Sequence, residues 1–112
     1  MIIFDIDGRK VALHTCEVLA VEDRGFSRQV WLDHRSYETS TTLEDLWKQL
    51  VFPYNPWWIR VDRYIIAADR IYEVEETETG RAVAHIGKRI FSLPMSFNEL
   101  IGLIDKMREE GE

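Results

Sequence analysis

The sequence is poor in cysteine, proline and glycine, with 1, 3 and 6 of them among 112 residues. The single cysteine, Cys16, cannot form an internal disulfide, so a reducing cytoplasm is the expected location. We expect Cys16 to be a small buried hydrophobe, because it lies between two apolar runs. No apolar run approaches the roughly 20 residues of a membrane helix, and no secretory signal opens the chain. Association with a membrane is therefore not expected.

Basic side chains are also few relative to acidic ones. The chain has 14 Lys and Arg against 20 Asp and Glu, which gives a net charge of −6. This balance argues against non-specific affinity for nucleic acids or membranes, although it leaves room for a local basic patch. Hydrophobic residues make up 46% and aromatic residues 12% of the chain, which excludes intrinsic disorder. The length allows one domain with one modest core.

The sequence offers no convincing catalytic or metal site. Its histidines, His14, His34 and His85, pair neither with one another nor with Cys16 at a metal-ligand spacing. We interpret them as surface or strand positions. The acidic group from Glu73 to Glu78 is interpreted as a solvated strand face. No enzyme activity and no cofactor are expected.

In the first half of the chain, periodicity and turn residues predict a succession of strands followed by a helix. Asp7-Gly8 is a strong signal for a two-residue hairpin turn. The expected strands span 1–6, 10–14, 17–22 and 29–33, with a short one from Tyr37. Thr41 and Glu44 fit a helix capping box, and apolar residues follow at helical spacing up to Leu50.

The second half repeats this plan. The stretch 57–76 reads as one or two strands rich in Trp, Ile and Tyr, with segments at 64–66 and 70–75. Further strands are expected at 82–86 and 89–93. Ser96 and Glu99 fit a second capping box, and apolar residues from Phe97 to Met107 form one helix face.

The two halves match without internal gaps over long runs. At a shift of 53, Val18 and Val21 fall on Ile71 and Val74, and at a shift of 54 Leu46 falls on Leu100. We therefore predict a mostly β fold with two short helices, in which a single domain over 1–112 contains two similar β-rich units at about 1–52 and 57–108. Neither unit can bury its apolar face alone, so both should pack into one core.

Two adjacent aromatics stand out at the start of the second half. Trp57 and Trp58 must point to opposite sides of an extended chain, next to Pro56. An exposed tryptophan there would suit a contact with a protein partner, a second copy or a stacked base. Burial of both between the two units explains the same residues equally well.

The central stretch and its surroundings resemble a known family. Leu43-Glu44-Asp45-Leu46, the run Trp58 to Ala68 (WIRVDRYIIAA) and Ile71 follow the order and spacing of the LytTR DNA-binding domain of bacterial response regulators. The segments EVLAVE and QVWLDHRSYETSTTLEDL continue the likeness in the N-terminal half. Small flagellar proteins of the FlbD type show a weaker similarity.

The resemblance implies an antiparallel β architecture whose loops read successive DNA grooves. Carried over by position, the residues implied to contact DNA are Arg24, Arg28, Arg63, Lys88 and Arg89. The chain departs from the family pattern at four places: Asp62 replaces a His, the Ser before Tyr64 is missing, Ala68 replaces an Asn, and Ser96 stands where the last loop has an Arg. A carboxylate near phosphates repels them, and a lost Arg removes a groove contact.

The leading hypothesis is a DNA-binding transcription regulator of the LytTR type without a receiver domain, because the chain begins at the domain edge. The alternative is a module that keeps this fold but works through a protein partner or as a homodimer, using Trp57 and Trp58. The acidic net charge and the changed motif residues favour the alternative.

Overall fold

A computed structural model describes residues 1–52, 55 and 57–111 of the chain. The first half contains the following elements: β1 (Ile2–Ile6), β2 (Arg9–Leu13), β3 (Ala20–Asp23), β4 (Arg28–Trp31), β5 (Ser36–Thr39) and α1 (Leu43–Val51). The second half contains β6 (Trp58–Val61), β7 (Tyr64–Ala67), β8 (Ile71–Glu76), β9 (Arg81–Ile86), β10 (Arg89–Ser96) and α2 (Phe97–Gly111). A 3-10 turn precedes β3 at Thr15–Glu17 and β8 at Ala68–Arg70. The same order of elements therefore occurs twice.

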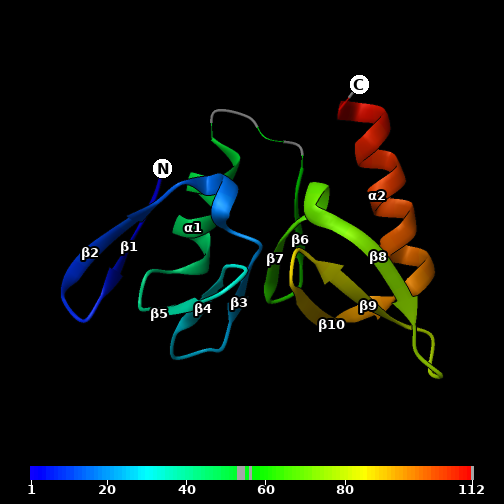
Figure 1. The fold of residues 1–112 in the computed structure, drawn as a ribbon, viewed down its shortest axis with the longest axis horizontal. Coiled ribbons are helices and arrows are strands. Elements are labelled where there is room, and N and C mark those ends of the chain that lie inside the picture. The colour runs from blue at the N-terminus through cyan, green and yellow to red at the C-terminus, as the bar shows by residue number, and fades with distance from the viewer. Residues whose placement is uncertain (53–54, 56, 112) are drawn as a thin grey trace.

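The strands form three antiparallel sheets. The central sheet has the order β5-β4-β3-β7-β6, so β3 of the first half pairs with β7 of the second. The hairpin β1-β2 forms one small sheet, and β10-β9-β8 forms the other. Figure 1 shows the β1-β2 hairpin and α1 on one side of the central sheet, with the β8–β10 sheet and α2 on the other. The mostly β, antiparallel fold with two helices that the sequence predicts is confirmed.

The prediction that both units pack into one core is wrong, because each face of the central sheet covers a core of its own. On one face, Val21, Val30 and Ile65 pack with Phe4 of β1 and Leu46 of α1. On the other face, a second core forms between this sheet, the β8–β10 sheet and α2. It includes Ala20, Ile66, Ala84, Leu93 and Leu100. Alternation along the strands produces this arrangement, because successive side chains point to opposite faces.

The hairpin turns follow the predicted chemistry. Asp7 and Gly8 both adopt positive φ, at 48° and 83°, as a tight two-residue turn between β1 and β2 requires. Asp62 occupies the corresponding turn between β6 and β7 with φ 51°. Asp tolerates this left-handed conformation better than most residues. At the position where the family motif has a His, this chain therefore has a residue that suits the geometry of the turn.

Both helices begin at capped residues, but both caps differ in part from the prediction. The side chain of Thr42, not Thr41, accepts the Asp45 N–H at 3.2 Å. Thr41 is used elsewhere, since its hydroxyl accepts the Asp5 N–H of β1 at 2.9 Å. At the second helix the expected cap is present in part: Ser96 Oγ accepts the Glu99 N–H at 3.1 Å, whereas the Glu99 carboxylate accepts from the Ser96 hydroxyl instead of from a main-chain N–H.

Two expectations for single segments are wrong. Cys16 is exposed, because 15–17 form a 3-10 turn on the surface instead of the start of a strand. The stretch 57–76 contains three strands, β6, β7 and β8, separated by a hairpin turn and a 3-10 turn. Among the described residues, no helix is long and apolar enough to cross a membrane.

Candidate nucleic-acid interface

Two turns that carry predicted DNA-contacting residues lie side by side. The Asp23 N–H donates to the carbonyl of Arg63 at 2.8 Å, which joins the β3–β4 turn to the β6–β7 turn. The side chain of Arg24 is 46% exposed and lies 3.2 Å from Glu22 through Nε. Arg63 is exposed at the tip of its turn. The long-range pairing of β3 with β7 thus brings these two arginines to the same end of the central sheet.

A second pair of turns is joined through Asp33. Its carboxylate accepts the Lys88 N–H at 2.7 Å and lies 3.4 Å from the guanidinium of Arg70. The ammonium of Lys88 is also 3.1 Å from Nε2 of His34. These contacts fix the β9–β10 turn against the β4–β5 turn, and they hold Lys88 at the seam between the two sheets.

Two cations lie over the ring of Trp31. The guanidinium of Arg89 is 5.0 Å from the centre of the indole ring and that of Arg24 is 5.8 Å from it. Arg89 is oriented further by donating from Nε to the Leu32 carbonyl at 2.8 Å. Arginine prefers such stacked positions on an aromatic face, where it keeps donors free for a carboxylate or phosphate.

A cleft of about 510 Å³ opens beside this stack. Its lining comes from both sheets: Glu22, Trp31, Tyr64, Lys88, Arg89, Ile90, Phe91 and Ser92. The rings of Trp31 and Tyr64 meet Phe91 edge to face, with centroids 6.0 and 6.5 Å apart. The cleft therefore has an aromatic floor and a basic wall, the combination of stacking surface and positive charge that suits nucleic acids.

One acidic side chain lies inside this basic group. Glu22 accepts a hydrogen bond from the Tyr64 hydroxyl at 3.1 Å and also pairs with Arg24. Burial, and then the negative charge of Glu22, raise the pKa of the Tyr64 hydroxyl above its usual value near 10. Tyr64 therefore stays a hydrogen-bond donor over the physiological pH range.

Arg28 is turned away from this surface. Its side chain is 11% exposed, and its guanidinium donates to the carbonyls of Ser40 at 2.7 Å and Thr41 at 2.9 Å. It also pairs with Asp23 at 3.5 Å. Because these bonds use most of its donors, Arg28 holds the base of the β3–β4 turn, and so positions Arg24.

The tryptophan pair separates as the extended geometry requires. Trp58 is buried in the core beneath α1, so it presents no surface to a partner. Trp57 is half-buried and lines a pocket of about 270 Å³ with residues that include Ile71, Ile104 and Arg108. Of this pair, only Trp57 reaches the outside of the molecule.

Two further features escape sequence reasoning. Phe26 is fully exposed at the tip of the β3–β4 turn, and its place between Gly25 and Ser27 in a basic turn was an available signal.

His85 meets two carboxylates across β8 and β9, with Nε2 at 3.0 Å from Glu75 and 3.4 Å from Glu73. The hydrogen bond between these carboxyls raises the pKa of Glu73 and lowers that of Glu75. The three side chains could supply ligands to a divalent cation.

Comparison with known proteins gives a match at the level of structure. No family model and no curated protein matches the sequence. The fold is similar to that of a LytTr DNA-binding domain from a Bacillus cereus protein described as a methyl-accepting/DNA response regulator. The TM-score is 0.67 at 10% sequence identity, over 91% of this chain and 93% of that one. The LytTR-like fold that the sequence predicts is thus confirmed.

Proposed function

We propose that this protein binds DNA and regulates transcription, and that the turns around Trp31 form the contact surface. The observation that carries the proposal is the likeness of fold to a LytTr DNA-binding domain over nearly the whole chain. The local geometry supports it. Arg24, Arg63, Lys88 and Arg89 come from turns far apart in sequence. Lys88 and Arg89 line the aromatic cleft, and Arg24 lies over its Trp31 ring.

The acidic net charge decides what kind of binding to expect. Because the chain carries −6 overall, long-range attraction to phosphates is weak, and binding depends on the local cations. We therefore expect modest affinity and a salt slope set by about four cationic side chains, near −3 to −4 for log K against log salt. Arg24 and Lys88 would contact phosphates, and Phe26 at the turn tip would contact base or sugar.

The experiment is binding of the purified protein to labelled promoter DNA from its own genome, measured by fluorescence anisotropy over a range of salt. Arg24→Ala and Arg63→Ala should each weaken binding and lower the magnitude of the slope by about one. Arg81→Ala removes the same charge from the exposed far end of β9, and it should leave the slope nearly unchanged. Absence of binding at low salt, where counterion release favours it most, would exclude this function.

A second function, as a protein-contact module, is favoured by one specific observation. The cations at the surface are tethered within the chain: Arg89 to the Leu32 carbonyl, Arg24 to Glu22 and Lys88 to His34. Tethered cations lose part of their capacity for phosphates. Salt-independent retention of an unrelated protein, together with no DNA binding, would support this second function.

A further inference from the structure

The outer edges of β2 and β8 lie at opposite ends of the molecule (Figure 1). The outer edge of β1 is covered, because Gln49 bonds both main-chain groups of Ile3 while Thr41 and Thr39 bond those of Asp5. Ile3 and Asp5 are paired with Ala12 and Lys10. Since Ile3 and Asp5 direct their main-chain groups away from β2, these two pairs are the non-hydrogen-bonded kind of an antiparallel ladder. In such a pair the partner residue also points outward, so Ala12 and Lys10 direct their main-chain groups away from β1.

The outer edge of β8 also carries main-chain groups that point away from its neighbouring strand. Ile86 and Arg89 flank a two-residue turn, and their main-chain groups are hydrogen-bonded to each other. Because main-chain groups alternate in direction along a strand, those of His85 and Val83 point toward β8, where they pair with the main chain of Glu73 and Glu75. Val74 and Glu76 therefore direct their main-chain groups outward. Within residues 1–52, 55 and 57–111, no main-chain hydrogen bond reaches the outer edge of β2 or of β8.

The chain itself contains a template for closing such an edge. β3, the strand after the 3-10 turn of the first half, pairs with β7, the second strand of the other half. Val21 of β3 lies opposite Ile65 of β7. In the repeated order of elements, β8 corresponds to β3 and β2 corresponds to β7. The strand that β8 lacks is therefore a β2, and the β2 of the same chain lies on the far side of the molecule (Figure 1).

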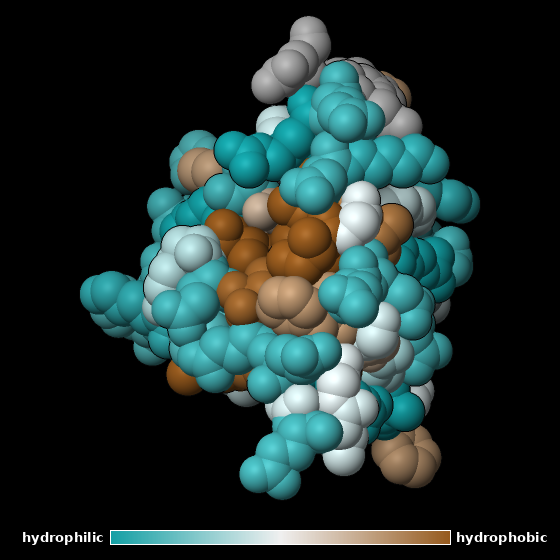
Figure 2. Space-filling model, turned by 90° about the vertical axis from the view of Figure 1, so that its right-hand side faces the viewer, coloured by the Kyte–Doolittle hydropathy of each residue, from teal (hydrophilic) through white to brown (hydrophobic). Residues whose placement is uncertain are grey.

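Apolar side chains next to the β8 edge are only half covered. At the corresponding place beside β3, Ile65 and Ala67 of β7 fill the core that includes α1. Figure 2 views the side that carries β8 and α2, and it shows apolar atoms gathered in a hollow ringed by hydrophilic side chains. The half-buried apolar residues of these two elements that pack against the core are Ile71, Val74, Ile104 and Met107. A strand added at β8 would cover them.

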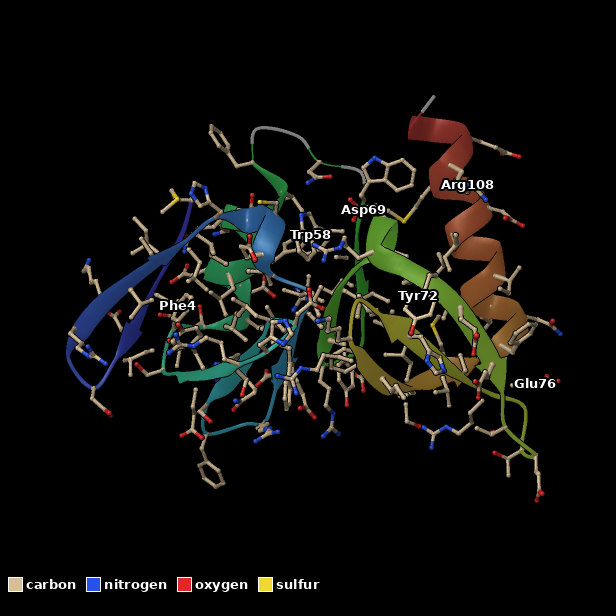
Figure 3. All side chains as sticks on the ribbon, in the orientation of Figure 1. Phe4, Trp58, Asp69, Tyr72, Glu76 and Arg108 are labelled. Atoms are coloured by element: carbon tan, nitrogen blue, oxygen red, sulfur yellow. The ribbon has the colours of Figure 1, made fainter. Side chains whose placement is uncertain are left out.

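The charges of the two edges are complementary. β8 carries Glu73, Glu75 and Glu76, and Figure 3 shows Tyr72 and Glu76 along this strand. β2 begins with Arg9 and Lys10, both exposed. Like charges on facing strands repel and opposite charges attract, so β8 favours β2 over a second β8. This excludes a symmetric β8–β8 dimer as the favoured arrangement.

We propose that β2 of one copy pairs antiparallel with β8 of the next and repeats between molecules the β3–β7 pairing found within each. With the register of the template, Ala12 lies opposite Val74 and Lys10 opposite Glu76. The two surfaces differ, so the contact is head to tail and forms rings or open chains of molecules. The assembly is non-covalent and leaves the cleft at Trp31 outside the contact.

The experiment is sedimentation analysis of the full chain without DNA, over a wide range of concentrations. The average mass should rise above that of the 13.2 kDa monomer as concentration increases. Ala12→Pro removes an outward N–H, which β1 does not use, and should abolish the rise while circular dichroism stays unchanged. A wild type that remains monomeric, or an Ala12→Pro variant that is folded and associates equally well, would overturn the proposal.

Charge exchange tests the register independently of proline. Lys10→Glu and Glu76→Lys should each weaken association by about three- to tenfold, because each places like charges opposite one another. An equimolar mixture of the two variants should associate again, since the acidic β2 of one meets the basic β8 of the other. Lys48→Glu, an exposed charge reversal on α1, is the matched control. Failure of the mixture to recover would contradict the β2–β8 pairing, whatever the outcome with DNA.

Discussion

At the scale of single residues, Gly87 shows how two turns are locked together. Its φ is +56°, and a Cβ built there would lie 2.4 Å from Oδ1 of Asp33 and 3.0 Å from the side chain of Leu19. Asp33 cannot move freely, because it also bonds the Lys88 N–H and faces Arg70. The close approach of the β9–β10 turn to the central sheet therefore depends on the absence of a side chain.

We predict that Gly87→Ala lowers the free energy of unfolding by about 2 kcal/mol, from left-handed strain plus the clash with Asp33. Gly8→Ala is the matched control. Gly8 has φ +83° but nothing within 4 Å of the added carbon, so only the strain, about 1 kcal/mol, should remain. Chemical denaturation measures both values. Equal losses would show that Asp33 yields without cost.

Ionisation of the Tyr64 hydroxyl makes the stability of the fold depend on pH. Its pKa in the folded protein is raised by burial and by Glu22. A group whose folded pKa lies above its unfolded value contributes stability that is fully present below the unfolded pKa. That contribution is lost as the pH rises through the folded pKa. We expect the thermal stability of the wild type to fall more steeply than that of Tyr64→Phe between about pH 9 and pH 12. Parallel curves would show that Tyr64 ionises freely.

At the scale of elements, the cap of α1 decides where the helix starts. Thr42 accepts the Asp45 N–H, whereas Thr41 accepts the Asp5 N–H of β1. We predict that Thr42→Ala costs about 1 kcal/mol of unfolding free energy and that Thr42→Ser costs nearly none, because serine keeps the cap. Urea denaturation distinguishes the two. A full loss with serine would mean that the Thr42 methyl, not its hydroxyl, is what matters.

Local signals in the sequence predicted most elements. Asp7-Gly8, the alternating apolar residues and the Ser96–Glu99 box have physical effects within a few residues, and the structure contains the hairpin, strands and cap that they indicate. The boundary errors near Cys16 and Thr41 arise where neighbouring segments compete for the same residues. There, a 3-10 turn or a long-range bond to β1 is preferred.

Long-range contacts carried no such signal. Nothing near Arg24 or Arg89 indicates that both lie over Trp31, because the stack depends on how two sheets meet. The distinction between Arg28 and Arg24 is also invisible in the sequence, since both are arginines of one basic turn. The carbonyls of Ser40 and Thr41, which lie beyond the next strand, draw Arg28 inward. A duplicated unit at 1–52 and 57–108 stays a prediction that the repeated order of elements supports.

At the scale of the whole molecule, the central sheet is shared by two cores. Val21 and Ile65 face the core under α1, while Ala20 and Ile66 of the same strands face the core under α2. Because β3 and β7 come from different halves of the chain, loss of either half removes strands that both cores need. The two halves should therefore unfold together as a single two-state unit.

Paired core substitutions test this coupling. Leu46 of α1 and Leu100 of α2 are both fully buried, one in each core. We predict that Leu46→Ala and Leu100→Ala each lower the unfolding free energy by about 2–5 kcal/mol. In each variant, tryptophan fluorescence and far-ultraviolet circular dichroism should report the same midpoint, because the shared sheet transmits the loss to both sides. Separate midpoints in either variant would show that one half stays folded without the other, and the shared sheet would then not couple the two cores.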